Sequence, residues 1–227
     1  MTIPACPYAL FDLDGTLVDS MAHWKRLPLA FFASHGLSVN EAERNRLLAS
    51  HGYGEILDFC RERGVNVTLP ELMEFLHLHM VDAYEREIPL KAGALPLLHT
   101  LRDSDCKMGL ITMTPHRDAE VCLARHGLSP FFSFVLTPED MPDGSGKEEP
   151  EIFELALEKL GGARPGECLF FEDSLYAVET ASKMGFRIMA VKDVSAAYAR
   201  ERIDALAEQT LDLDAPPPEP NDFCGTS

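Results

Sequence analysis

The chain has 227 residues and a formal net charge of −17, with 37 acidic against 20 basic residues. This balance argues against a nucleic-acid partner, because phosphate backbones are bound by a surplus of Lys and Arg, and it suits an anionic membrane surface no better. No apolar run approaches the roughly 18 residues that a membrane-spanning helix needs. The N-terminus shows no secretory signal, and the six cysteines form no C-x-x-C pair. These features favour a cytoplasmic protein with reduced thiols.

The first predicted element is a short apolar run at residues 8–11, which indicates a buried strand that ends on two carboxylates, Asp12 and Asp14. Gly15 follows them and allows a sharp turn. Ligands of open α/β sheets bind at the carboxyl ends of the strands. Two acids in this place could hold a hard cation such as Mg²⁺, or one could attack a phosphoryl group. The alternative is a turn in which the acids only cap a helix.

The next stretch, residues 21–88, carries helical patterns and no convincing strand. Pro28 is expected to kink or divide the first of its helices. The predicted helices cover residues 21–35, 40–49, 54–63 and 71–87. We therefore expect an all-helical insertion.

From residue 89 onward, strands alternate with helices, which predicts a parallel sheet with helices on both faces. Strands are expected at 107–112, 132–136, 168–171 and 186–191, and helices at 94–102, 115–126, 150–160, 174–184 and 195–208. The predicted fold is a doubly wound α/β sheet formed by residues 1–20 and 89–210, interrupted by a helical cap at 21–88. An acidic, proline-rich tail is expected over 211–227.

Three further polar sites come just past predicted strands. Thr112 stands where a hydroxyl and backbone N–H groups could grip phosphate oxygens. Lys147 lies in a Gly-rich loop ahead of a helix. Glu172 and Asp173 close a buried run, where acids are costly unless they are paired or bound to a metal. Taken singly, the sites have ordinary interpretations: a helix cap, an exposed lysine and an N-cap at Asp173.

Taken together and in this order, the four signatures resemble the four motifs of the haloacid dehalogenase-like (HAD) hydrolases, most of which are Mg²⁺-dependent phosphohydrolases. The resemblance spans about residues 8–191 and extends to the helical-cap branch of phosphoglycolate phosphatase and β-phosphoglucomutase. It implies a Rossmann-like core with Asp12 as the nucleophile that forms an aspartyl-phosphate. Asp14 would be the general acid and base. Because dehalogenases of this superfamily lack that second acid, the resemblance favours phosphoryl transfer.

The resemblance also implies how the other residues serve. Thr112 and Lys147 would bind the phosphoryl group, with Lys147 also stabilising Asp12. Mg²⁺ would be held by carboxylates and one backbone carbonyl, from Asp12, Asp14, Asp173 and Glu172. The charges agree with this, because four acids and an anionic substrate repel one another unless a cation and a lysine are present.

Two positions depart from the family pattern. Met113 stands where many relatives have Asn, so one hydrogen bond to the substrate is expected to be missing. The run Lys147-Glu148-Glu149-Pro150 stands where relatives often show Lys-Pro-x-Pro, so Glu148 and Glu149 depart from the pattern. Neither change removes a group that the mechanism requires.

The cap is expected to close over the site and to contact the leaving group. Its candidate contacts are His23, Trp24, Lys25, Arg26 and the loop at His51, for which ordinary surface or cap-core roles are equally consistent. His77 and His79 are two residues apart on a predicted helix and do not share a face, so we interpret them as non-functional.

The leading hypothesis is therefore a phosphohydrolase acting on a small phosphorylated metabolite. A phosphomutase of the β-phosphoglucomutase kind stays open, although the cap shows no sugar-selective signature. A phosphonoacetaldehyde hydrolase would need a cap lysine, and the position of Lys25 gives no particular support. A non-catalytic phosphate- or metal-binding regulator is the third alternative, against which the large cap and the intact Asp12 and Asp14 pair argue.

Overall fold

The computed structural model describes residues 3–48, 53–142 and 144–214. The chain divides into two compact units. One lies within residues 1–19 and 89–227 and is called the core unit below. The other, Ser20–Ile88, is called the helical unit.

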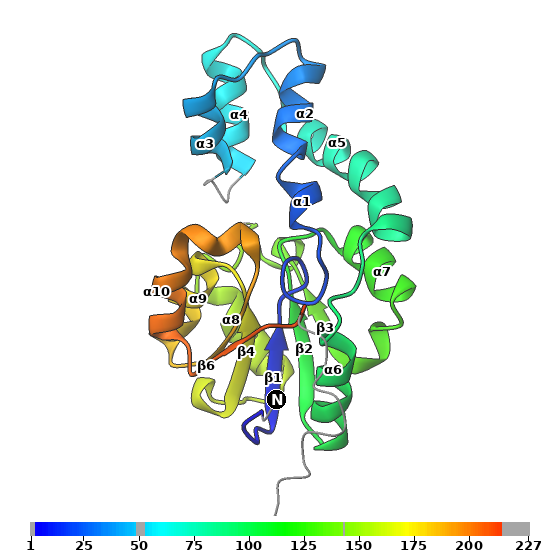
Figure 1. Cartoon of the computed structure of the whole chain (residues 1–227), viewed down its shortest axis with the longest axis vertical. Coiled ribbons are helices and arrows are strands. Elements are labelled where there is room, and N and C mark those ends of the chain that lie inside the picture. Colours follow the sequence, from blue (N-terminus) through cyan, green and yellow to red (C-terminus); the bar gives the residue numbers. More distant parts are fainter. Residues whose placement is uncertain (1–2, 49–52, 143, 215–227) are drawn as a thin grey trace, which may run out of the picture. The chain divides into compact units, whose positions relative to one another are not determined.

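The core unit is built on one six-stranded sheet in which all neighbouring strands are parallel (Figure 1). The strands are β1 (Tyr8–Phe11), β2 (Lys107–Ile111), β3 (Phe132–Leu136), β4 (Cys168–Glu172), β5 (Arg187–Val191) and β6 (Gln209–Leu211). Their order is β3-β2-β1-β4-β5-β6, so the chain winds outward from β1 in one direction and then in the other. The switch between β1 and its neighbours is where open α/β sheets bind ligands.

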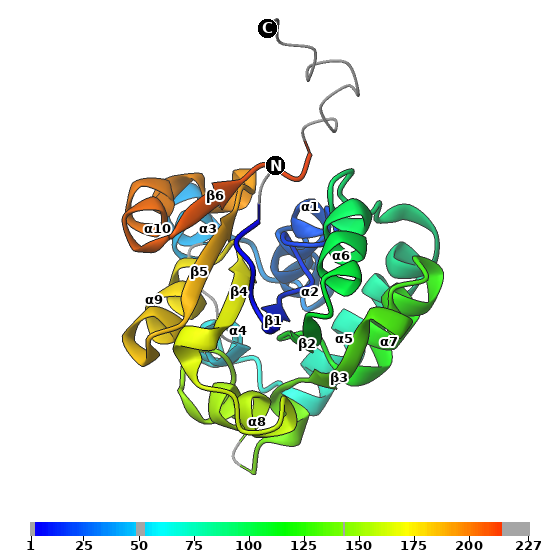
Figure 2. The same cartoon turned by 90° about the horizontal axis from the view of Figure 1, so that it is seen from below.

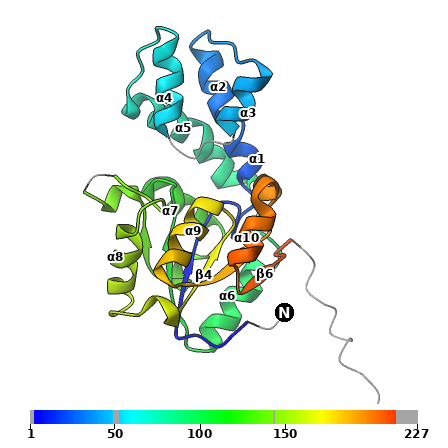
Figure 3. The ribbon, with the colours of Figure 1, turned by 90° about the vertical axis from the view of Figure 1, so that its left-hand side faces the viewer.

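Helices cover both faces of this sheet. Figure 2 shows α6 (Ala94–Asp103) and α7 (His116–Arg125) on one face. Figure 3 looks onto the other face, where α8 (Glu151–Lys159), α9 (Leu175–Met184) and α10 (Arg200–Leu206) lie. Short 3₁₀ turns complete the unit: η2 (Ser129–Phe131), η3 (Pro138–Asp140), η4 (Pro165–Glu167) and η5 (Val194–Ala199).

Alternation along the strands fills both layers of the core. Leu10 and Phe170 belong to the cluster that packs under α8 and α9. Their neighbours Phe11 and Phe171 point to the opposite face, where the two rings stack with centroids 4.3 Å apart. The central strands are buried on both faces, which explains why they read as continuous apolar runs.

Helices alone form the described part of the helical unit. They are α1 (Met21–Trp24), α2 (Leu27–Ser34), α3 (Glu41–Leu48), α4 (Tyr53–Glu62), α5 (Leu69–Asp82) and a π-helical turn, η1 (Ala83–Glu87). Aromatic side chains make its core: the rings of Phe32 and Phe59 lie 4.4 Å apart, and those of Phe31 and Phe75 lie 5.0 Å apart. Among the helices of the described residues, none combines the length and apolar character needed to cross a bilayer.

The doubly wound sheet and the helical insertion are confirmed, with two corrections in the core unit. The segment expected as one helix over 195–208 is a 3₁₀ turn, η5, followed by α10. The tail was expected to begin at Leu211, but Leu211 ends β6, because this short segment pairs with β5 at the edge of the sheet. Leu213 beyond it is 1% exposed, and its carbonyl accepts a hydrogen bond from the Gly93 N–H.

Other expectations fall into place or outside the described residues. Pro28 stands in the first turn of α2, where proline is tolerated. The helix expected over residues 21–35 is divided just before it, into α1 and α2. Residues 215–227 of the expected tail and the loop residue His51 lie outside the described residues. The described cysteines are buried and unbridged: Cys6, Cys60, Cys106, Cys122 and Cys168.

Candidate active site

The loop after β1 carries the first pair of acids. The Asp12 N–H donates to the Phe171 carbonyl at 3.0 Å, which continues the pairing of β1 with β4. Gly15 then turns the chain with φ +83°, a conformation that favours glycine. A Cβ built on Gly15 would lie 2.6 Å from Asp173 Oδ2, so the absence of a side chain lets that carboxylate approach the loop.

Lys147 bridges two of the acids. Its Nζ lies 2.5 Å from Asp12 Oδ1 and 2.6 Å from Glu172 Oε2. The lysine is 1% exposed and both carboxylates are buried, which excludes the interpretation of Lys147 as an ordinary exposed lysine. Such charge-assisted contacts fix the orientation of each carboxylate.

The end of β4 holds the second pair of acids against α9. Glu172 Oε1 accepts hydrogen bonds from the N–H groups of Asp173 and Ser174, at 3.1 and 2.9 Å. Asp173 Oδ1 accepts from the Thr16 hydroxyl at 3.3 Å. Asp173 is not the N-cap of α9, as the ordinary interpretation would require, because the helix begins after Ser174.

Asp12, Glu172 and Asp173 form a cluster with the chemistry of a metal site. Each offers a carboxylate oxygen, and these oxygens lie within 4.8 Å of one another. Among the described residues, the buried atoms Asp12 Oδ2 and Asp173 Oδ2 have no hydrogen-bond partner. Leaving such oxygens unpaired is costly, and a hard divalent cation, which prefers oxygen ligands, would satisfy them. The cluster could therefore hold a metal ion.

The charges in this cluster perturb one another. Burial, and next the charge of Glu172, raise the pKa of Asp12, while burial and the same charge raise the pKa of Asp173. Burial alone would lower the pKa of Lys147, but the charges of Asp12 and Glu172 outweigh it and keep that pKa above its usual value. One ammonium among three acids leaves an excess of negative charge, which a divalent cation would balance.

The end of β2 adds two threonines. Thr112 is 1% exposed, and its N–H donates to the Leu136 carbonyl of β3 at 2.9 Å. Its hydroxyl accepts a hydrogen bond from the Thr114 N–H at 3.1 Å. The Thr114 hydroxyl in turn donates to Asp14 Oδ2 at 2.6 Å. Thr114 was not anticipated from the sequence, although the T-M-T spacing within the second motif could have indicated it.

Two other features near Lys147 were not anticipated. Burial raises the pKa of Tyr176 in the first turn of α9, and the charge of Lys147 acts against that rise. One turn further on, the Thr180 hydroxyl donates to the Glu148 carbonyl at 3.1 Å. On the other side, Met113 lies against Gly146, where a Cβ would collide with its sulfur. The loop of Lys147 is therefore held from α9 and from the end of β2.

The predicted cap contacts belong to the helical unit. His23 and Trp24 end α1, and Lys25 follows them. The Trp24 indole N–H donates to the Tyr84 hydroxyl at 3.1 Å, so its polar end is engaged within that unit. His79 stacks on Phe75 with ring centroids 3.8 Å apart. The role of these cap residues in substrate binding therefore stays a prediction. The six expected site residues of the core unit lie at the ends of β1, β2 and β4 and in the loop before α8.

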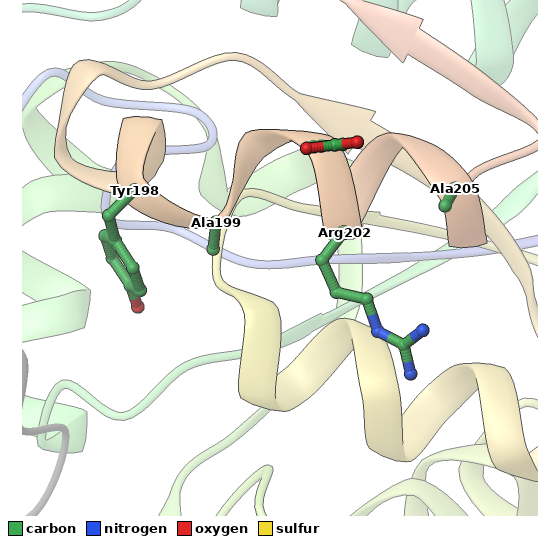
Figure 4. Close-up of a pocket in the computed structure, with 5 residues that line it drawn as sticks. Tyr198, Ala199, Arg202 and Ala205 are labelled. Atoms are coloured by element: carbon green, nitrogen blue, oxygen red, sulfur yellow. The ribbon is translucent and has the colours of Figure 1, made fainter.

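A shallow surface pocket lies elsewhere on the core unit (Figure 4). It is lined by Tyr198, Ala199, Glu201, Arg202 and Ala205. Figure 4 shows the Tyr198 and Arg202 side chains on the same side of the ribbon, and Arg202 pairs with Glu179 of α9 at 3.1 Å. None of the acids at the strand ends lines this pocket.

Comparison with known proteins decides the family. A family model described as a haloacid dehalogenase-like hydrolase matches residues 8–185. The chain belongs to this family. The match confirms the resemblance that the four motifs predicted.

Relatives and solved structures agree with this assignment. Hexitol phosphatase A from Escherichia coli is 31% identical over 189 residues, covering 82% of this chain and 83% of that protein. Phosphoglycolate phosphatase from Rhodobacter capsulatus is 27% identical over 214 residues, covering 88% and 89%. CbbY from Rhodobacter sphaeroides, solved in complex with phosphate, superposes with a TM-score of 0.76 over 92% of this chain and 95% of that chain. At 22% identity that likeness shows the fold. The chain is a phosphatase of the haloacid dehalogenase-like family.

Proposed function

We propose that this phosphatase hydrolyses a small phosphomonoester through an aspartyl-phosphate formed on Asp12, with Mg²⁺ as its cofactor. The observation that carries the proposal is the arrangement around Lys147, which holds Asp12 and Glu172 beside the unpartnered oxygens of Asp12 and Asp173. A nucleophile held by a lysine beside a metal-binding cluster is what displacement at phosphorus requires.

The first step forms the phosphoenzyme. A carboxylate oxygen of Asp12 attacks phosphorus, and the ester P–O bond breaks. Asp14 gives its proton to the departing oxygen, which leaves as an alcohol. The Lys147 ammonium and the Thr112 hydroxyl bind phosphoryl oxygens, so that negative charge developing on them is met by fixed donors.

The second step releases phosphate. Asp14, now a carboxylate, takes a proton from water, and the water oxygen attacks phosphorus. The bond between phosphorus and the Asp12 oxygen breaks, which restores the Asp12 carboxylate and yields inorganic phosphate. Asp14 is protonated again and ready for the next turnover.

The described residues fit the expected metal. The carboxylates of Asp12, Glu172 and Asp173 and the backbone carbonyl of Asp14 would hold Mg²⁺, which prefers oxygen ligands. When bound, the ion supplies positive charge that draws an anionic phosphoryl group into an acidic site.

For the substrate class, we infer a small phosphorylated hydroxy compound. Two relatives are named hexitol phosphatase and phosphoglycolate phosphatase, and hexitols and glycolate are both short hydroxylated carbon skeletons. The net charge of −17 agrees with a small-molecule substrate more than with a nucleic acid.

The test is phosphate release from a panel of sugar, polyol, nucleotide and short-acid phosphomonoesters, with Mg²⁺ and with a chelator. Asp12→Asn should abolish release and prevent phosphoryl transfer to the protein, which mass spectrometry of the quenched enzyme measures. Asp103→Asn is the matched control, because Asp103 is exposed on α6 and should leave turnover unchanged.

Other outcomes would redirect the assignment. Interconversion of hexose phosphates without release of phosphate would favour the mutase alternative. Metal-dependent binding of phosphate without any turnover would favour a regulator. Turnover that persists in Asp12→Asn would contradict the proposed nucleophile.

A further inference from the structure

We propose that Thr114 is a positioning residue that holds Asp14 for proton transfer and sets the direction of the Thr112 hydroxyl. This inference rests on the proposed function, in which Asp14 protonates the leaving group. It concerns a hydrogen bond between two side chains that joins the end of β2 to the loop after β1, from Thr114 Oγ1 to Asp14 Oδ2 at 2.6 Å.

Thr114 is itself fixed by its surroundings. It is 2% exposed and lies between the end of β2 and Pro115, which precedes the first turn of α7. A residue before proline is restricted to extended conformations. Two residues earlier, the Thr112 N–H is anchored on β3 through the Leu136 carbonyl. The hydroxyl therefore approaches Asp14 from a segment that is anchored at the end of the sheet, which suits a catalytic geometry.

The hydrogen bond constrains Asp14 in a way that serves an acid. Asp14 is half-buried and lies in the loop after β1, so the hydrogen bonds of its carboxyl group decide which rotamer it adopts. Because Oδ2 accepts from the Thr114 hydroxyl, this hydrogen bond ties one oxygen of the Asp14 carboxyl group to the end of β2. A hydrogen bond to a carboxylate is also among the stronger kinds. Thr114 thus constrains the rotamer that Asp14 adopts.

The same residue acts on Thr112 through its backbone. The Thr114 N–H donates to Thr112 Oγ1 at 3.1 Å, so the Thr112 hydroxyl hydrogen points away from that N–H. A hydroxyl has one donor hydrogen and can accept as well as donate. With the acceptor role met by the protein, its hydrogen can be donated to a phosphoryl oxygen. Thr114 therefore orders a donor for the phosphoryl group and an acid for the leaving group.

The experiment compares Thr114→Val, which removes the hydroxyl at nearly constant shape, with Thr114→Ser, which keeps it. We would measure kcat/KM, which reports the steps up to loss of the leaving group, for two esters. One is the best alkyl phosphate of the substrate panel, whose leaving oxygen needs a proton. The other is p-nitrophenyl phosphate, whose phenolate departs without one.

The expected result is selective. A general acid contributes about 10²–10⁴-fold, so Thr114→Val should lower kcat/KM for the alkyl ester by about 10-fold to 100-fold, part of that contribution. The loss for p-nitrophenyl phosphate should stay within about threefold, because proton donation contributes little to its departure. Thr114→Ser should restore the alkyl ester to within about threefold of wild type, since it keeps the hydroxyl donor.

Three outcomes would overturn the inference. Equal losses on both esters, or a serine variant no better than valine, would show that the hydroxyl does not act through Asp14. Thermal unfolding shows whether the variants fold. If neither Thr114→Val nor Thr114→Ala folds, Thr114 has a structural role alone. Absence of turnover by the wild type on every ester would instead refute the proposed function itself, and the inference with it.

Discussion

Asp12 and Asp173 each bury a carboxylate oxygen that has no hydrogen-bond partner among the described residues. Burial, followed by the charge of Glu172, raises the pKa of Asp12 from its usual value of 3.8 to about 8, and Asp173 shifts in the same direction. Groups that serve the function of an enzyme but lower its stability are common in active sites. In this chain they tie the stability of the metal-free protein to pH.

A pH-dependent stabilisation by Mg²⁺ follows. Between a pKa of about 3.8 unfolded and about 8 folded, the folded state holds more protons than the unfolded state, so stability falls as pH rises. Bound cation favours the ionised carboxylates and offsets this loss. The rise in Tm on adding Mg²⁺ should therefore be larger at about pH 8 than at about pH 5. Thermal unfolding with Mg²⁺ or with chelator measures it.

The comparison contains its own control, because surface groups titrate alike with and without the ion and cancel in the difference. Asp173→Asn removes one charge and should reduce both the pH trend and the effect of Mg²⁺. A Tm increment that stays constant or shrinks toward high pH would contradict the assignment of the cluster as the metal site.

A second prediction at the scale of one residue concerns Gly15. Alanine at this place meets two obstacles, the positive φ and the Asp173 carboxylate 2.6 Å from its Cβ. We expect Gly15→Ala to cost about 1 kcal/mol or more in stability and to lower kcat at least about 10-fold by displacing Asp173, a proposed metal ligand. Denaturant unfolding and phosphate release measure the two effects.

Gly127→Ala is the matched control, because Gly127 also has a positive φ, of +65°, but an added Cβ there meets no atom within 4 Å. It should lose a similar amount of stability and keep its activity. Equal kcat for both alanine variants would show that the close approach of Asp173 to the loop has no role in catalysis.

At the scale of elements, the segment after the helical unit is fastened to the sheet by one buried lysine. Lys91 Nζ lies 3.1 Å from Asp193 Oδ2, 3.0 Å from Asp214 Oδ2 and 3.1 Å from the Lys192 carbonyl. The same segment pairs with the loop after β1, since the Lys91 N–H donates to the Leu17 carbonyl at 2.9 Å. One side chain thus joins three separate segments of the core unit.

Breaking this contact should be costly. Lys91→Met leaves the Asp193 carboxylate, whose side chain is 3% exposed, buried without its cation. Removing one partner of a buried pair costs about 3–5 kcal/mol. Urea unfolding measures the loss. Lys192→Met is the control, because its pair with Asp212 is half-exposed at 3.7 Å and should contribute at most about 1 kcal/mol. Similar losses in both variants would contradict the role of Lys91.

Most elements could be predicted because their signals are local. The run at 8–11 and the alternation of strands and helices from residue 89 gave β1 to β5 nearly to the residue. The missed strand β6 has three residues, Gln209–Leu211, with no period to detect, and exists because the edge of β5 is available. The turn at 194–199 has a helical composition but adopts 3₁₀ geometry.

The candidate site was predictable for a different reason. Parallel strands bring their carboxyl ends to one edge, so acids placed after β1 and β4 had to approach each other. The hydrogen-bond partners were not predictable. Thr114 reaches Asp14 across 100 residues of sequence, and Thr16 reaches Asp173 across 157, so both contacts depend on the assembled sheet.

At the scale of the whole molecule, the charge of −17 acts on the approach of an anionic substrate. Repulsion lowers the concentration of phosphomonoester near the protein, and salt screens it over a Debye length of about 10 Å at about 0.1 M. We therefore expect kcat/KM to rise by about twofold or more between low and physiological ionic strength. The assay holds free Mg²⁺ at a saturating level.

The control for this prediction is kcat, which should hardly change with salt. It describes enzyme that already holds its substrate, so repulsion during the approach of the substrate no longer affects it. A fall in kcat/KM with added salt would contradict the prediction. It would mean that Lys147 and the bound ion govern the approach of substrate despite the overall charge.

The central place of β1 also affects how the enzyme matures during synthesis. Asp12 leaves the ribosome before Lys147, which follows it by 135 residues. At about 5–20 residues per second, Asp12, the proposed nucleophile, waits roughly 7–30 s for its ammonium partner. In that interval β1 is an apolar segment with open edges, the kind of strand that chaperones shield. The helical unit, made from contacts close in sequence, can fold meanwhile. The segment that carries Asp12 is thus made before its lysine partner and becomes functional only after it.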